Sequence, residues 1–127
     1  MFIEGRIRGS GAVKDMAARV HDAMYQQCQS RGYAAPVDVL VDIGVLNKAK
    51  YDDWRAGRVS YLEAACNVNL HKLSEIMKVI RTFAARNGWK PSISSYKHKG
   101  KQLRFSKTGN PKIETAYATH YWMENEL

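Results

Sequence analysis

The chain has 127 residues, of which 45% are hydrophobic and 25% charged, and its formal net charge is +8 at neutral pH. This length suits one hydrophobic core and is short for two ordinary domains, and the composition excludes a globally disordered chain. No run approaches the roughly 18 to 20 apolar residues that cross a bilayer, and no apolar stretch follows the N-terminus as in a signal peptide. We therefore expect a cytoplasmic protein with no membrane association.

The first ten residues differ in character from the rest. Ile3-Glu4-Gly5-Arg6 spells a protease linker site, and Gly9-Ser10 resembles a cloning junction. We interpret residues 1–10 as a cloning remnant or a flexible N-terminal segment, and residues 11–127 as a single helical domain.

The first predicted element is an amphipathic helix over residues 12–30. Its apolar residues, among them Val20, Met24 and Cys28, recur at steps of three and four, which places them on one helix face. Gly32 is suited to the left-handed conformation that ends many helices. Both cysteines of the chain, Cys28 and Cys66, lie in such apolar segments and are interpreted as small core residues of a reducing compartment.

A short helix is predicted over residues 36–43, because Pro36 and Asp38 suit the first turn and Gly44 suits the end. A buried strand is the rival interpretation, since β-branched residues alternate through this segment.

Two further short helices are predicted before the longest one. Asn47 can cap a helix that runs to about Ala56, and Ser60 with Glu63 forms a capping-box pattern at the start of a helix over residues 61–66. The longest helix begins near Asn69 and stops at Gly88. Its apolar stripe consists of Leu70, Leu73, Met77, Ile80 and Ala84.

After Pro91 the pattern becomes β-like. Residues 93–97 and 102–106 are β-prone and flank a turn at Gly100, so they predict a hairpin, with Leu103 and Phe105 facing the core and Gln102, Arg104 and Ser106 facing outward. A last helix is predicted over residues 111–123. The expected fold is therefore mainly α with a small β-hairpin (α+β), in an element order that is also that of a winged helix-turn-helix.

The positive charge is concentrated in one block. Residues 76–113 contain ten basic and no acidic residues, whereas the other ten basic and twelve acidic residues balance to −2. A single-sign block is costly through self-repulsion, so an anionic partner would explain it. Its members are Lys78, Arg81, Arg86, Lys90, Lys97, Lys99, Lys101, Arg104, Lys107 and Lys112.

Nucleic acid is the predicted partner, with DNA favoured over RNA, because hydroxyl and aromatic side chains are interleaved with these cations near residues 92–107. An interaction module that docks on an acidic protein is the alternative, and a merely solvated hairpin explains the charge without any partner. The predicted nucleic-acid contacts are Lys97, Lys99, Lys101, Arg104 and Lys107 on the hairpin, assisted by Lys78 and Arg81 on the long helix.

No catalytic, metal or cofactor site is predicted. The four histidines are widely spaced and lack a nearby cysteine pair, and no phosphate-binding glycine loop is present. If the protein were an enzyme, Tyr96, His98 and Arg104 would be the first residues to test.

Aromatic and arginine side chains gather in residues 54–63. The structural interpretation buries Trp54 and pairs Arg55 or Arg58 with nearby carboxylates, and the functional one makes the arginines phosphate ligands. The patterns W-R-x-G-R-V-x-Y-L-E at 54–63, L-R-F-S-K-x-G at 103–109 and A-Y-A-T-H at 116–120 resemble those of a group of small uncharacterised bacterial proteins. The resemblance spans about residues 36–122 and implies a bacterial origin, but it carries no function.

Overall fold

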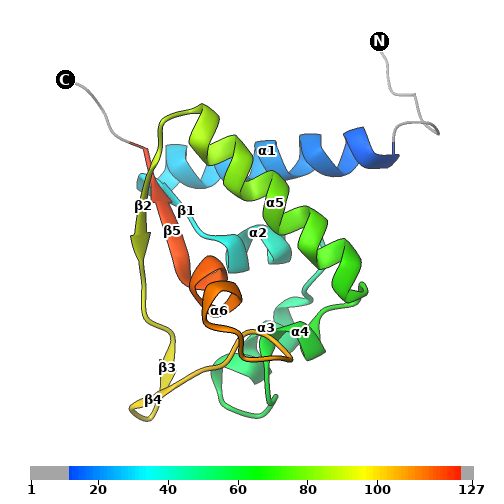
Figure 1. The fold of residues 1–127 in the computed structure, drawn as a ribbon, viewed down its shortest axis with the longest axis vertical. Helices are drawn as coiled ribbons and strands as arrows, with labels where there is room; N and C mark the ends of the chain where they lie inside the picture. The colour runs from blue at the N-terminus through cyan, green and yellow to red at the C-terminus, as the bar shows by residue number, and fades with distance from the viewer. Residues whose placement is uncertain (1–11, 124–127) are drawn as a thin grey trace.

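The structure is a computed structural model that describes residues 12–123, so the segment 1–10 set apart above lies outside the described residues. Helices pack against one side of a small antiparallel sheet (Figure 1), and the predicted α+β class is confirmed. In chain order the elements are α1 (Ala12–Arg31), β1 (Tyr33–Ala34), α2 (Pro36–Asp42), α3 (Lys48–Arg55), α4 (Leu62–Ala65), α5 (Leu70–Arg86), β2 (Lys90–Ile93), β3 (Lys97–His98), β4 (Lys101–Gln102), α6 (Pro111–Ala118) and β5 (Thr119–Trp122).

α3 and α5 begin where their predicted capping residues stand. Asn47 Oδ1 accepts a hydrogen bond from the Ala49 amide at 2.8 Å, and Asn69 Oδ1 accepts one from the Lys72 amide at 2.8 Å. The segment after Pro36 is a helix and not the rival strand, because proline stands in its first turn and Val39 N donates to the Ala35 carbonyl at 2.9 Å.

The capping box predicted for α4 is wrong. The N-cap residue is Tyr61, which makes no side-chain capping bond, and Glu63 turns away from the helix start to bind Lys107 N and the Tyr117 hydroxyl. The Ser60–Glu63 spacing predicted the cap, but the Glu63 carboxylate accepts hydrogen bonds from segments more than forty residues away in the chain.

The last predicted helix is wrong in its second half. α6 ends at Ala118, and Thr119–Trp122 forms β5, the central strand of the sheet β1-β5-β2. β5 pairs antiparallel with both neighbours, so its backbone groups are satisfied on both sides. This pairing outweighs the helical continuation, and the alternation of buried Thr119 and Tyr121 with more exposed His120 and Trp122 is the sequence signal for it.

The hairpin strands are shorter than predicted. β3 and β4 pair over two residues each, and residues 90–93 join the other sheet as β2.

One hydrophobic core lies between α1, α2, α5 and the inner face of the sheet. α1 and α5 pack on each other (Figure 1), and the predicted stripe residues Val20, Met24, Leu73 and Ile80 are buried. Leu70 was predicted in the same stripe but is 48% exposed, because it is the first residue of α5. Within residues 12–123, no helix is long and apolar enough to cross a membrane.

Candidate nucleic-acid interface

The tip of the β3–β4 hairpin is a tight two-residue turn. Lys99 has a φ of +51° and Gly100 a φ of +81°, the left-handed pair that matches the twist of two short antiparallel strands. Lys97, Lys99 and Lys101 are exposed, and no ion pair among the described residues joins them to a carboxylate. The predicted hairpin is therefore present, with three lysines among the six residues of its ladder and turn.

The base of the hairpin is anchored to α3. The His98 ring lies against Gly57, where an added Cβ would approach the ring to 3.2 Å, and Gly57 also has a φ of +78°, so both the contact and the backbone favour glycine. Tyr96 is buried with its ring centroid 5.7 Å from that of Trp54, and the Arg55 guanidinium lies 5.1 Å from the Tyr96 centroid. The lysines thus project from a packed base.

The two long motifs meet behind the hairpin. The Arg104 carbonyl accepts hydrogen bonds from Trp54 Nε1 at 2.8 Å and from the Leu62 amide at 3.1 Å, and the Phe105 carbonyl accepts one from the Glu63 amide at 2.9 Å. Trp54 is fully buried, as the structural interpretation of residues 54–63 predicted. Residues of the W-R-x-G-R-V-x-Y-L-E and L-R-F-S-K-x-G patterns therefore hydrogen-bond to each other and form one structural unit.

Glu114 on α6 holds the same segment from the other side. Its carboxylate accepts hydrogen bonds from Phe105 N at 3.0 Å, Ser106 N at 2.7 Å and Ser106 Oγ at 2.6 Å. Ser106 is consequently buried, and the prediction that it faces outward is wrong. The strand alternation fails here because the chain bends toward Glu114 instead of continuing β4.

Two of the predicted contact residues, Arg104 and Lys107, follow the hairpin and differ in whether their side chains are free to contact a ligand. Arg104 donates from Nε to the Ser106 carbonyl at 2.9 Å and from a terminal nitrogen to the Lys107 carbonyl, and its guanidinium lies 5.5 Å from the Tyr61 ring centroid. Arg104 therefore fastens its own loop. Lys107 is exposed, while its backbone amide donates to Glu63 at 2.8 Å. Charge counting alone could not separate these two roles.

Lys78 and Arg81 occupy a different surface. They line a cleft of about 440 Å³ between α5 and α6, together with Lys112, which the sequence analysis did not single out. Its apolar lining includes Met77, Ala116 and Tyr117. The structure therefore places one part of the basic block at the hairpin tip and another part, Lys78, Arg81 and Lys112, at this cleft.

Arg58 pairs with Asp53, with 3.2 Å between a guanidinium nitrogen and Oδ1, as the structural interpretation predicted. Arg55 instead stacks on Tyr96, and its buried Nη1 has no hydrogen-bond partner among the described residues. The local acidic neighbours of Arg55 in sequence do not decide where its guanidinium lies.

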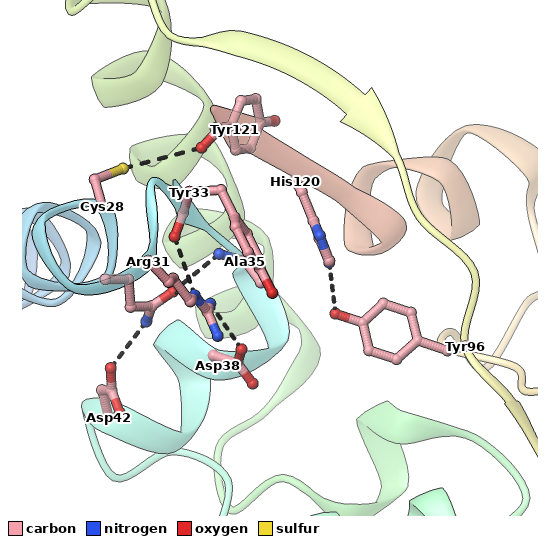
Figure 2. A network of polar contacts seen from close by, with 10 residues as sticks. Cys28, Arg31, Tyr33, Ala35, Asp38, Asp42, Tyr96, His120 and Tyr121 are labelled. Atoms are coloured by element: carbon pink, nitrogen blue, oxygen red, sulfur yellow. Dashed lines mark hydrogen bonds and ion pairs between the residues drawn. The ribbon is translucent and has the colours of Figure 1, made fainter. Parts of the chain in front are cut away.

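The outer face of the sheet carries Tyr33, His120 and Trp122, which sequence reasoning assigned to no site, and the buried Tyr96 meets them from the loop after β2. The Tyr96 hydroxyl lies 2.9 Å from His120 Nε2, and Figure 2 shows His120 between Tyr33 and Tyr96. Burial lowers the pKa of His120, with Arg31 acting in the same direction and Asp38 opposing. The neutral ring can therefore accept a hydrogen bond from the Tyr96 hydroxyl. Burial also raises the pKa of Tyr96 and keeps it a donor.

Groups for other chemistry are sparse. Across residues 12–123 there is no cluster of three or more histidine, cysteine or acidic side chains that could hold a metal ion. Comparison with protein-family models, with curated proteins and with solved structures finds no match.

Proposed function

We propose that this protein binds nucleic acid, with the β3–β4 hairpin as its primary contact. The observation that carries the proposal is the placement of Lys97, Lys99 and Lys101 on an exposed tip whose base is buried against Trp54 and Gly57. A hairpin backbone that is already held at its base has less backbone entropy to lose on contact, and phosphates supply the complementary charge.

The neighbouring cations extend this surface or form a second one. Lys107 follows the hairpin and is exposed, and Lys78, Arg81 and Lys112 gather at the α5–α6 cleft. The order of α5 followed by a hairpin is that of a winged helix-turn-helix, in which a helix enters the major groove and the wing touches the backbone. Arg104 is left out of the proposed contacts because its guanidinium is bound to its own loop.

An acidic protein partner is the second candidate, because the same lysines would pair with carboxylates. The two candidates differ in whether the protein binds generic nucleic acid. A module that docks specifically on an acidic protein is expected not to bind nucleic acid at low salt.

The test is a salt series with duplex DNA, single-stranded DNA and RNA. Each phosphate neutralised contributes about −0.9 to the slope of log affinity against log salt for duplex DNA. Replacing Lys99 and Lys101 together by Gln should weaken binding and flatten the slope by up to about 1.8 units. The matched control replaces Lys48 and Lys50 of α3 by Gln, an equal loss of formal charge outside the block.

A third variant, Lys78→Gln with Arg81→Gln, shows whether the cleft belongs to the same interface. An unchanged affinity and slope for the hairpin variant, relative to the control, would contradict the proposal and favour the acidic-protein candidate.

A further inference from the structure

The outer face of the three-stranded sheet is an organised aromatic surface. Tyr33 pairs directly with Trp122 across β1 and β5, so the two side chains lie on the same face. His120 lies two residues before Trp122 on that face, opposite Ser92 of β2. Tyr96, which ends the linker from β2, bonds to His120.

These side chains form a continuous row, here called the aromatic row: Tyr96, His120, Tyr33 and Trp122. His120 stacks on Tyr33 with 5.0 Å between ring centroids and 12° between planes. Trp122 lies 4.6 Å from Tyr33, and Tyr96 meets His120 edge-on at 5.8 Å. Each ring supports the next, so the terminal indole is held in place before any ligand arrives.

The end of the aromatic row is open. Trp122 exposes 43% of its surface, whereas the other two tryptophans of the chain, Trp54 and Trp89, expose 0% and 8%. An exposed tryptophan built on stacked neighbours is unusual for a merely solvated sheet face, because indole is the largest side chain to leave in water.

Basic residues lie near the middle and both ends of the aromatic row. The Arg31 guanidinium lies 4.1 Å from the Tyr33 ring centroid, with Asp38 paired to it at 2.8 Å. The register places Lys90 beside Trp122 on this face, and Lys97 follows Tyr96 directly in the chain. Cations beside an exposed aromatic ring, here Trp122, are the combination that single-stranded nucleic acid contacts through its phosphates and its bases.

We infer that the aromatic row binds single-stranded nucleic acid, with an unpaired base stacked on Trp122 and the backbone continuing toward the hairpin lysines. This inference rests on the proposed function and adds the strand state of the ligand to it. Inside a duplex both faces of a base are covered by its neighbours, so away from the duplex ends the indole can stack only on an unpaired base. Stacking is tolerant of sequence, because every base presents a π-face.

Intrinsic fluorescence gives a site-specific test, since only one of the three indoles is open to a base. Titration with oligo-deoxythymidine or oligo-uridine of about 12 nucleotides should quench part of the tryptophan emission in a saturable way. Trp122→Phe keeps a ring against Tyr33 and should abolish this quenching while emission from Trp54 and Trp89 stays unchanged.

Affinity is measured in parallel by anisotropy of the labelled oligonucleotides. Trp122→Ala should weaken single-strand binding about 5- to 150-fold, the range for the loss of one base–aromatic stack, and should affect a duplex of equal length far less. Tyr25→Ala is the matched control, because Tyr25 is an aromatic residue of α1 that exposes 53% of its surface. Thermal unfolding by circular dichroism confirms that each variant is folded.

The outcomes separate the two proposals. Binding that depends on Lys99 and Lys101 but neither quenches Trp122 nor weakens in Trp122→Ala would overturn this inference and leave the hairpin proposal standing. Tighter binding of duplex than of single strand would also overturn it. Failure of all three nucleic acids to bind at low salt would overturn both.

Discussion

The Glu114 carboxylate makes the most quantifiable contribution to the segment behind the hairpin. It is the acceptor for the amides of Phe105 and Ser106 and for the Ser106 hydroxyl, and both of those residues expose only 1% of their surface. Glu114→Ala would leave two buried N–H groups without an acceptor. Hydrogen bonds to a charged group contribute about 1.5 to 3 kcal/mol each, and an unsatisfied buried donor costs about 1 to 3 kcal/mol.

Glu114 is itself half-buried, so water can replace part of what is lost. We therefore expect Glu114→Ala to lower the free energy of unfolding by about 2 to 4 kcal/mol, a large part of the roughly 5 to 15 kcal/mol typical of a domain. Urea unfolding followed by circular dichroism measures this change. Glu114→Gln keeps one acceptor oxygen and should lose less.

The control is Glu75→Ala on α5, whose carboxylate has, among the described residues, one solvent-exposed ion pair with Lys72 and lies 3.4 Å from His71 Nε2. Such pairs contribute about 0 to 1 kcal/mol. A Glu114→Ala protein no less stable than Glu75→Ala would refute the reasoning, because the buried amides of residues 105 and 106 would then have found other partners.

Three further results are expected. Trp54→Phe removes the donor to the Arg104 carbonyl from a fully buried site and should cost about 1 to 3 kcal/mol in urea unfolding, and a change below about 0.5 kcal/mol would contradict the assigned bond. Burial raises the pKa of the Cys28 thiol, and burial with the nearby Glu63 carboxylate raises that of Cys66 to about 12, so a thiol reagent should label neither cysteine until the protein unfolds. Fast labelling of the native protein would show that the thiols are accessible. Burial lowers the pKa of His120 in the folded protein below its ordinary 6.5. Below about pH 6.5 the unfolded chain therefore binds more protons than the folded protein, and the melting temperature should decrease as the pH is lowered. His120→Gln should reduce the fall, and an equal fall in both proteins would contradict the role of His120.

Local sequence determined most of the helical structure. Apolar spacing over three and four residues and capping by Asn47 and Asn69 act within a few residues of each other, so they can be recognised without a fold. The hairpin turn is equally local, because Gly100 supplies a positive φ wherever the chain needs one. The concentration of cations was likewise visible, and it correctly marked Lys97, Lys99 and Lys101 as exposed residues of a hairpin.

Tertiary structure decided which basic and aromatic side chains share a surface. The strand Thr119–Trp122 exists because β1 and β2, from distant parts of the chain, supply hydrogen bonds on its two sides, and no local preference reports such partners. The same pairing places Tyr33 beside Trp122. α6 places Glu114 beside Ser106, and it forms one wall of the cleft that Arg81 lines. Sequence periodicity records which face of an element is apolar, but long-range pairing selects the neighbour of each remaining side chain.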